Sequence, residues 1–202
     1  RRILIIYPTN DWNGAFSGQH SMDLIDSFIE NGWEVLFYEV SNEDEMKEAI
    51  RDAARWDGEE FENPVDAAIF GGHGRQDSIS FGERDPAQVE DIDERKAFDI
   101  GDEEEFEDLR GFIKPIDVNP DSTILLESCS TGEGGKEAEN VANMVHRLWG
   151  VEVHAPKIPW GAAKIEFGEG GRILNIEKGE DIYYSIEAQP QIQEVVPPIC
   201  SI

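Results

Sequence analysis

Short apolar runs alternate with amphipathic segments along most of the chain. Runs of this kind, rich in aliphatic and β-branched residues, are typical of buried strands. We expect strands at residues 2–7, 33–40, 65–70, 123–127 and 151–155. Because buried strands that alternate with helices usually pair in parallel, the pattern predicts an α/β fold with helices on both faces of a mostly parallel sheet.

Three of the intervening segments carry apolar residues at helical spacing. The expected helices are 21–31, 42–56 and 136–149. Ser21 is a candidate N-cap and Asn42 opens the second helix, because side chains of these types accept hydrogen bonds from the first free backbone N–H groups. Gly32 and Gly150 stand where the first and third helices should stop.

After Pro159 the pattern changes to short β-type runs around a GEGG turn. We expect a C-terminal β-hairpin and one further strand at 163–167, 172–176 and 181–186. The remaining residues are rich in Pro and Gln. The sequence therefore predicts one domain over residues 1–186 and an extended tail over residues 187–202.

Residues 83–110 interrupt the alternation with 13 acidic and 4 basic residues and little periodicity. We expect a long surface loop there, with one short helix around Phe106. The whole chain has a net charge of −27. This charge argues against a nucleic-acid partner or an anionic membrane surface, which need clustered cations.

No apolar run reaches the roughly 18 residues that a membrane-spanning helix needs, so no membrane insertion is expected. Two cysteines in 202 residues do not make a disulfide framework, although Cys129 and Cys200 could form one bond. A reducing compartment, with the cytoplasm favoured, is the default expectation. The chain begins with Arg rather than Met, which is consistent with part of a larger protein.

Polar and Gly-rich loops follow three of the expected strands: TNDWNG, GGHGRQD and ESCSTGEGG. In open parallel sheets such loops carry the ligand chemistry. His73 lies between two glycines, which allow close backbone approach. Cys129 occupies the equivalent place after a later strand. If the two strands are neighbours, the thiol and the imidazole can meet across one cleft.

An imidazole beside a thiol can activate it as a nucleophile. The backbone N–H groups of Gly74 and Cys129 could then hold a developing oxyanion. Taken separately, Cys129 could be a small core residue and His73 a turn residue. Their matched positions favour a Cys–His dyad.

The motifs GHG (residues 72–74) and ESCSTG (residues 127–132) resemble those of the caspase-fold cysteine peptidases of clan CD. They are nearest to metacaspases, CHAT-type peptidases and the self-processing domains of bacterial toxins. The later run VEVHAPK and the AAKIEFGEGGRIL segment also look like their strand and hairpin. The resemblance implies a caspase-like three-layer sandwich, with a mostly parallel central sheet and a C-terminal β-hairpin.

The resemblance further implies a cysteine endopeptidase with Cys129 as nucleophile and His73 as general acid and base. Gly74 would contribute its N–H to the oxyanion hole together with that of Cys129. Glu127 stands where metacaspases place a carboxylate of the pocket for the residue before the cut bond. Asp11 is the expected second pocket carboxylate, and Asp23 is an alternative.

A carboxylate pocket would pair with a cation, so we expect cleavage after Arg or Lys. A solvated or helix-capping role for Glu127 is the competing interpretation. The expected partner is a protein or peptide substrate, and no cofactor or metal is expected. Calcium remains open as an activator, although the acidic segment lacks a defined calcium-loop pattern. Self-cleavage in that segment is a further hypothesis, at Arg84, Arg95, Lys96 or Arg110.

Three other interpretations compete with this one. A flavodoxin-like or receiver-like binding module would use the loop TNDWNGAFSGQ to hold a phosphate or flavin, but the loop lacks a tight phosphate signature. A catalytically silent caspase-like domain would serve in assembly and would not cleave peptides. An amidotransferase-type hydrolase would need its His after the Cys; His154 follows Cys129 but lies within an expected strand.

Overall fold

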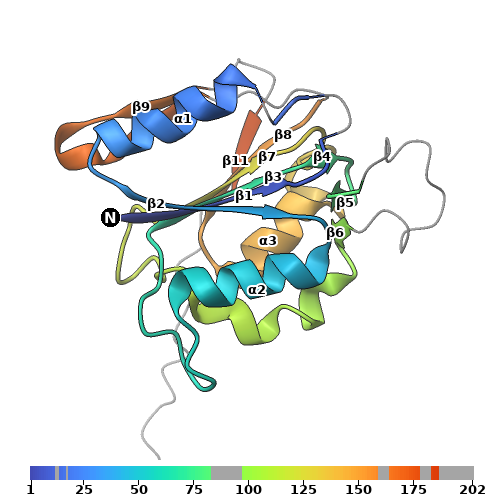
Figure 1. Cartoon of the computed structure of the whole chain (residues 1–202). Helices are drawn as coiled ribbons and strands as arrows, with labels where there is room; N and C mark the ends of the chain where they lie inside the picture. Colours follow the sequence, from blue (N-terminus) through green and yellow to red (C-terminus); the bar gives the residue numbers. More distant parts are fainter. Residues whose placement is uncertain (12–13, 17, 83–96, 159–163, 178–182, 187–202) are drawn as a thin grey trace, which may run out of the picture.

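The computed structural model describes residues 1–11, 14–16, 18–82, 97–158, 164–177 and 183–186. A six-stranded sheet crosses the molecule in the order β11-β8-β7-β3-β1-β2 (Figure 1). Its strands are β1 (Arg2–Pro8), β2 (Glu34–Val40), β3 (Ala67–Gly71), β7 (Thr123–Glu127), β8 (Glu152–Pro156) and β11 (Tyr183–Ile186). The first five strands are parallel and β11 runs antiparallel to β8. The predicted parallel α/β architecture is confirmed.

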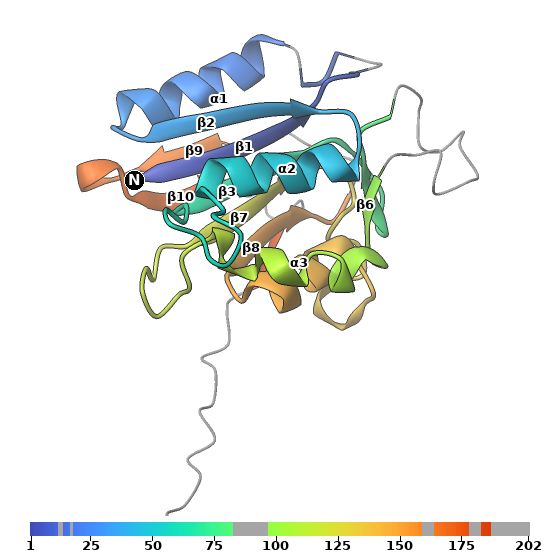
Figure 2. The same cartoon turned by 60° about the horizontal axis from the view of Figure 1, so that its bottom comes forward.

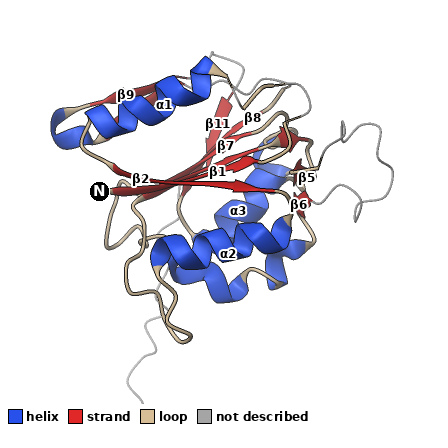
Figure 3. Ribbon diagram, viewed as in Figure 1, coloured by secondary structure: helices blue, strands red, loops and turns tan. Residues whose placement is uncertain are grey.

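Helices cover both faces of this sheet (Figures 1 and 3). Helix α1 (Gln19–Glu30) lies on one face beside the hairpin formed by β9 (Lys164–Phe167) and β10 (Ile173–Glu177). Helices α2 (Glu43–Ala54) and α3 (Val141–Trp149) lie on the other face, as the rotated view in Figure 2 shows. The predicted C-terminal hairpin is therefore confirmed.

Alternate side chains of β1 face two separate cores, which explains why the whole strand is apolar. Ile3 and Ile5 belong to the core beneath α1, whereas Leu4 and Ile6 belong to the core beneath α2 and α3. All four are essentially inaccessible to solvent. Burial of each such side chain contributes roughly 1.5–3 kcal/mol to folding.

The helix starts differ in part from those predicted. Asn42 caps α2 as expected, because its side-chain oxygen accepts a hydrogen bond from the Glu45 N–H at 2.9 Å. The prediction of Ser21 as the cap of α1 is wrong, since the helix begins at Gln19 after an extended Gly18. Ser21 is instead buried against the sheet.

Helix α3 begins later than predicted. Asn140 caps it by accepting the Asn143 N–H at 2.8 Å, whereas the preceding residues form a single 3₁₀ turn, η5 (Gly135–Glu137). Gly150 ends α3 in the left-handed conformation, as expected. The five residues before α3 therefore belong to the turn that follows Cys129 rather than to the helix.

The surface-loop prediction for residues 83–110 is wrong over residues 97–110, whereas the short helix expected around Phe106 is matched by 3₁₀ helices on either side of this residue. Strand β6 (Ala97–Asp99) joins β4 (His73–Gly74) and β5 (Ser78–Ser80) in a small antiparallel sheet. Two 3₁₀ helices follow, η3 (Asp102–Glu104) and η4 (Glu107–Phe112). Four large apolar side chains of residues 97–112 are buried, those of Phe98, Phe106, Leu109 and Phe112. These few residues, spaced among many carboxylates, anchor the segment. Residues 83–96 lie outside the described part of the chain.

Asp102 lies among other carboxylates at the start of η3. Burial, followed by the charges of Asp99, Glu43 and Glu105, raises the pKa of Asp102 to about 7, although the Asp99 N–H opposes this by donating a hydrogen bond at 2.6 Å. Protonation of Asp102 therefore favours the folded state. Its contribution to stability is complete below the ordinary pKa of 3.8 and is lost as the pH rises through about 7.

We expect the Asp102→Asn substitution to raise the free energy of unfolding at about pH 8 by about 1 kcal/mol. Asparagine keeps an oxygen for the Asp99 N–H but removes the charge, and the site is open enough for solvent to screen the effect. Near pH 4 the two proteins should be similar in stability. Urea unfolding at both pH values measures this. Glu104→Gln, an exposed carboxylate in the same turn, is the control; a gain from Asp102→Asn that is equal at both pH values would contradict the assignment.

Within the described residues no helix is long and apolar enough to cross a membrane. The extended tail predicted for residues 187–202 lies outside the part of the chain that the structure describes.

Candidate active site

The turns that carry His73 and Cys129 lie side by side at the carboxyl edge of the sheet. They follow β3 and β7, which are neighbours, and Gly71 pairs with Glu127 at the ends of these strands. The Ser128 hydroxyl donates a hydrogen bond to the Gly72 carbonyl at 2.9 Å. A Cβ placed on Gly74 would lie 2.7 Å from the Cys129 nitrogen. Only glycine therefore lets the two backbones approach so closely.

Cys129 lies in a turn with unusual backbone geometry. Ser130 adopts a left-handed conformation with φ of 57°, and the Thr131 hydroxyl donates to the Ser128 carbonyl at 3.0 Å. The thiol is half-buried. Burial raises the pKa of Cys129, although its own backbone N–H opposes the shift. The thiol is therefore protonated at neutral pH and needs a base to become a nucleophile.

Cys129 forms no disulfide with any described residue. Cys200, with which the sequence would allow a disulfide, lies outside the described part of the chain.

His73 is held on two sides. Its Nε2 atom lies 3.3 Å from Oδ1 of Asp11, a contact that lacks the alignment of a hydrogen bond. The ring of Phe16 meets the imidazole edge-on at 5.4 Å between centroids. Asp11 is itself fixed, because its Oδ2 accepts the Phe16 N–H at 2.7 Å. Only 10% of the His73 side chain and 6% of the Asp11 side chain are exposed.

Asp11 thus contacts the imidazole, a position that the sequence did not indicate. It follows β1, and β1 lies on the opposite side of β3 from β7. The strand order therefore lines up Asp11, His73 and Cys129 along one edge of the sheet. The Asp11 carboxylate therefore approaches the imidazole at Nε2.

Glu127 lies in a row of residues across three strands. Tyr7 of β1 is level with Gly71 of β3, which pairs with Glu127 of β7. Because Gly71 has no side chain, the Tyr7 ring lies over it, and the Tyr7 hydroxyl donates a hydrogen bond to Glu127. Only 3% of Glu127 is exposed. Burial, followed by the charge of Glu127, raises the pKa of Tyr7.

Sequence reasoning missed Tyr7 because it reads as one more apolar residue of a buried strand. The available signal was a tyrosine near the end of one strand, Tyr7, together with a glycine at the end of another strand, Gly71. Asp23, the alternative to Asp11, is exposed on α1, where it accepts a hydrogen bond from Gln19 at 2.7 Å.

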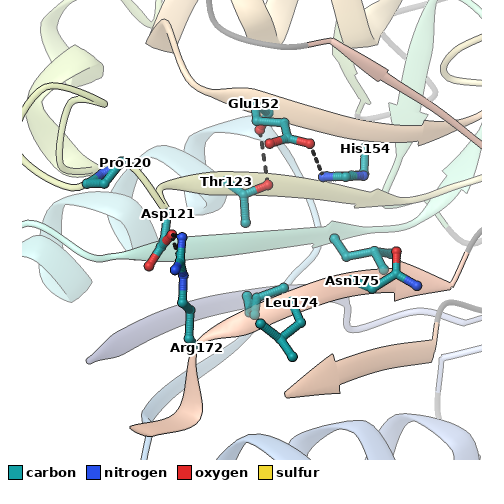
Figure 4. Close-up of a pocket in the computed structure, with 10 residues that line it drawn as sticks. Pro120, Asp121, Thr123, Glu152, His154, Arg172, Leu174 and Asn175 are labelled. Carbon is teal, nitrogen blue, oxygen red and sulfur yellow. Dashed lines mark hydrogen bonds and ion pairs between the residues drawn. The ribbon is translucent and has the colours of Figure 1, made fainter. Parts of the chain in front are cut away.

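A separate polar hollow of about 270 Å³ lies near the amino ends of β7 and β8 (Figure 4). Its charged groups pair with one another: His154 with Glu152 at 2.8 Å, and Arg172 with Asp121 at 2.7 Å. His154 is level with Leu125, four residues before Cys129. This position gives no support to a site that combines His154 with Cys129.

No group of three or more metal-binding side chains is arranged to hold an ion within the described residues. Three of the proposed self-cleavage positions, Arg84, Arg95 and Lys96, lie outside those residues, as do 12, 13 and 17 of the first loop. Arg110 lies in η4 and forms an ion pair with Glu107 at 3.0 Å.

Neither the models of known protein families nor the curated protein sequences match the chain. A function for the chain therefore depends on the residues that its fold brings together.

Proposed function

We propose that this chain is a cysteine endopeptidase of the caspase-like clan, in which Cys129 is the nucleophile and His73 the general acid and base. The close backbone contact between Gly74 and Cys129 carries the proposal, because it brings the two predicted reactive turns together. The parallel sheet with helices on both faces and a C-terminal hairpin supports it. This is the architecture that the motif resemblance implies.

In the proposed mechanism His73 removes the thiol proton as the sulfur attacks the substrate carbonyl carbon. A base is needed at that moment because burial keeps the thiol protonated. Asp11 stabilises the imidazolium that forms and holds the ring in position. His73 then protonates the leaving amine, and a water molecule hydrolyses the thioester with His73 again acting as base.

The backbone N–H groups of Gly74 and Cys129 are the proposed donors to the oxyanion. The approach of the two backbones brings these residues next to the sulfur. Donors fixed by the fold stabilise the negative charge that develops on the carbonyl oxygen without reorganising.

We propose cleavage after Arg or Lys, with Glu127 as the pocket carboxylate. Glu127 lies two residues before Cys129 and is buried, so a cation that reached it would meet a weakly screened charge. The Tyr7 hydroxyl already orients this carboxylate. A charge-assisted hydrogen bond to a guanidinium or ammonium group would add to that contact.

Peptidyl acyloxymethyl ketones, which alkylate reactive cysteines of peptidases, test this proposal. We expect the wild-type protein to be labelled by reagents that end in Arg or Lys, at Cys129. Cys129→Ala should remain unlabelled while keeping its thermal unfolding transition, because the side chain is small and only half-buried. Intact mass spectrometry gives the readout.

A panel that ends in Arg, Lys, Asp or Asn separates the parts of the proposal. Labelling by the Asp reagent alone would refute the basic preference but leave the peptidase in place. A wild-type protein that stays unlabelled by every reagent, with calcium and with chelator, would refute the peptidase itself.

A further inference from the structure

Strand β2 lies at one end of the central sheet and leaves one of its sides unpaired. It pairs with β1 over seven residues without a bulge, and no other described strand lies beside it. A free edge can pair with another chain, and many proteins protect theirs with lysine, proline, a bulge or a short strand. The sequence of β2, EVLFYEV, offers none of these protections. The edge is therefore open to a further strand.

The hydrogen bonds to β1 identify the backbone groups at this open edge. The Glu34 N–H donates to the Arg1 carbonyl at 2.9 Å, so the backbone of Glu34 faces β1. Successive residues of a strand direct their backbone groups to opposite sides, and the even-numbered residues of β2 share the direction of Glu34. The N–H and C=O groups of Val35, Phe37 and Glu39 therefore face the open edge.

Phe37 gives the open edge an exposed apolar centre. Val35 borders the core beneath α1, and Phe37 lies on the same face because side chains two residues apart in a strand point the same way. Phe37 is nevertheless 42% exposed. An aromatic ring that is this accessible beside a free strand edge can bury further apolar area against an added chain.

Helix α1 adds two exposed apolar side chains above this edge. Met22 and Ile29 are 53% and 55% exposed and lie, with the partly buried Ile25, on one stripe of the helix. This stripe is about a third of a turn beyond Leu24 and Phe28, which face the sheet. Because β1, α1 and β2 form a right-handed crossover, the stripe overhangs β2 rather than the hairpin (Figures 1 and 2). The apolar border of the edge therefore continues from β2 onto α1.

Carboxylates surround this apolar border. Helix α1 and strand β2 contain no Lys or Arg and carry five acidic residues: Asp23, Asp26, Glu30, Glu34 and Glu39. A partner with Lys or Arg next to its apolar residues would complement this edge. A second copy of the chain would not, because each copy has a net charge of −27 and would present the same carboxylates.

We propose that β2 binds an extended segment of another protein, rich in apolar and basic residues, which adds one strand to the sheet. Strand addition draws its affinity from backbone hydrogen bonds and its specificity from alternate side chains. Here the odd-numbered residues of β2 supply the hydrogen bonds. Phe37, Met22 and Ile29 supply the apolar contacts, and the carboxylates select the cations. The inference uses neither residue of the dyad and does not depend on the peptidase proposal.

A fluorescently labelled seven-residue peptide of alternating Lys and Val tests this inference. The protein carries Cys129→Ala throughout, so that a peptidase activity would not consume the peptide. We expect fluorescence anisotropy to show binding, with a peptide of alternating Glu and Val at least about tenfold weaker. The double substitution Met22→Ser with Ile29→Ser should raise Kd about tenfold, because it removes apolar contacts. Glu39→Pro should raise Kd by a similar factor, because proline removes a donor from the open edge.

Val118→Ser is the matched control for the apolar substitutions. Val118 is 67% exposed but lies in the turn before β7, so Kd should not change. Thermal unfolding shows whether each variant is folded. Since Met22 and Ile29 are exposed, their double variant keeps the test decisive even where Glu39→Pro fails to fold.

Amide hydrogen exchange locates the bound peptide. In the free protein the N–H groups of Leu36 and Tyr38 should exchange slowly, and the peptide should slow exchange at Val35, Phe37 and Glu39 by about tenfold. Binding that leaves these three amides unchanged, as at the proposed substrate cleft, would overturn the inference. Absence of binding would overturn it too. A dimer of the protein that Glu39→Pro dissociates would instead assign the edge to a second copy.

Discussion

Asp11→Asn is expected to lower kcat by about two to four orders of magnitude while KM for Arg substrates changes little. The carboxylate lies 3.3 Å from the His73 ring and is fixed by the Phe16 N–H, so it can stabilise the imidazolium that forms in the proposed reaction. Asparagine keeps an acceptor for that N–H but has no charge. Steady-state kinetics with an Arg-aminocoumarin substrate measures both constants.

The pH profile adds a readout that a merely structural role would not change. Without the carboxylate the protonated imidazole is less favoured, so the acidic limb of kcat/KM should move to lower pH. Asp23→Asn is the control, because Asp23 is exposed on α1. A raised KM for Arg and Lys substrates with kcat unchanged would instead assign Asp11 to the substrate pocket.

The centre of the sheet could be predicted because β1, β3 and β7 are buried along their whole length and read as mostly apolar runs. The strand order could not, since it depends on how the faces pack. That order determines the neighbours of His73. Asp11 was therefore recognised as a candidate residue, yet its contact with His73 became visible only in the folded chain.

In the acidic segment the sequence-based prediction of a loop was wrong over residues 97–110. Its charge predicts a solvated loop, but Phe98 and Phe106 are fully buried and pack against each other with 4.8 Å between ring centroids. Burial of these two aromatic side chains holds the segment against the protein, because each buries a large apolar area, although the many neighbouring carboxylates favour solvent. A charge count over the whole segment does not reveal these few buried apolar residues.

Gly74→Ala is expected to lower the free energy of unfolding by roughly 3 kcal/mol and to abolish labelling of Cys129. The new methyl group would lie 2.7 Å from the Cys129 nitrogen and even closer to the Cys129 carbonyl oxygen and the Ser128 hydroxyl. Two of these contacts are with backbone, which cannot move aside without separating the two turns. Urea unfolding and labelling with the Arg reagent measure the two effects.

The loss of stability would come from steric overlap of the new methyl group alone, because Gly74 does not have the positive φ that disfavours other residues. Gly18→Ala is the matched control: its Cβ would meet nothing closer than 3.8 Å, so the cost should stay below about 1 kcal/mol with labelling intact. A Gly74→Ala protein that remained as stable and as reactive as the wild type would show that the turns do not meet. The proposed dyad would then lose the contact on which it depends.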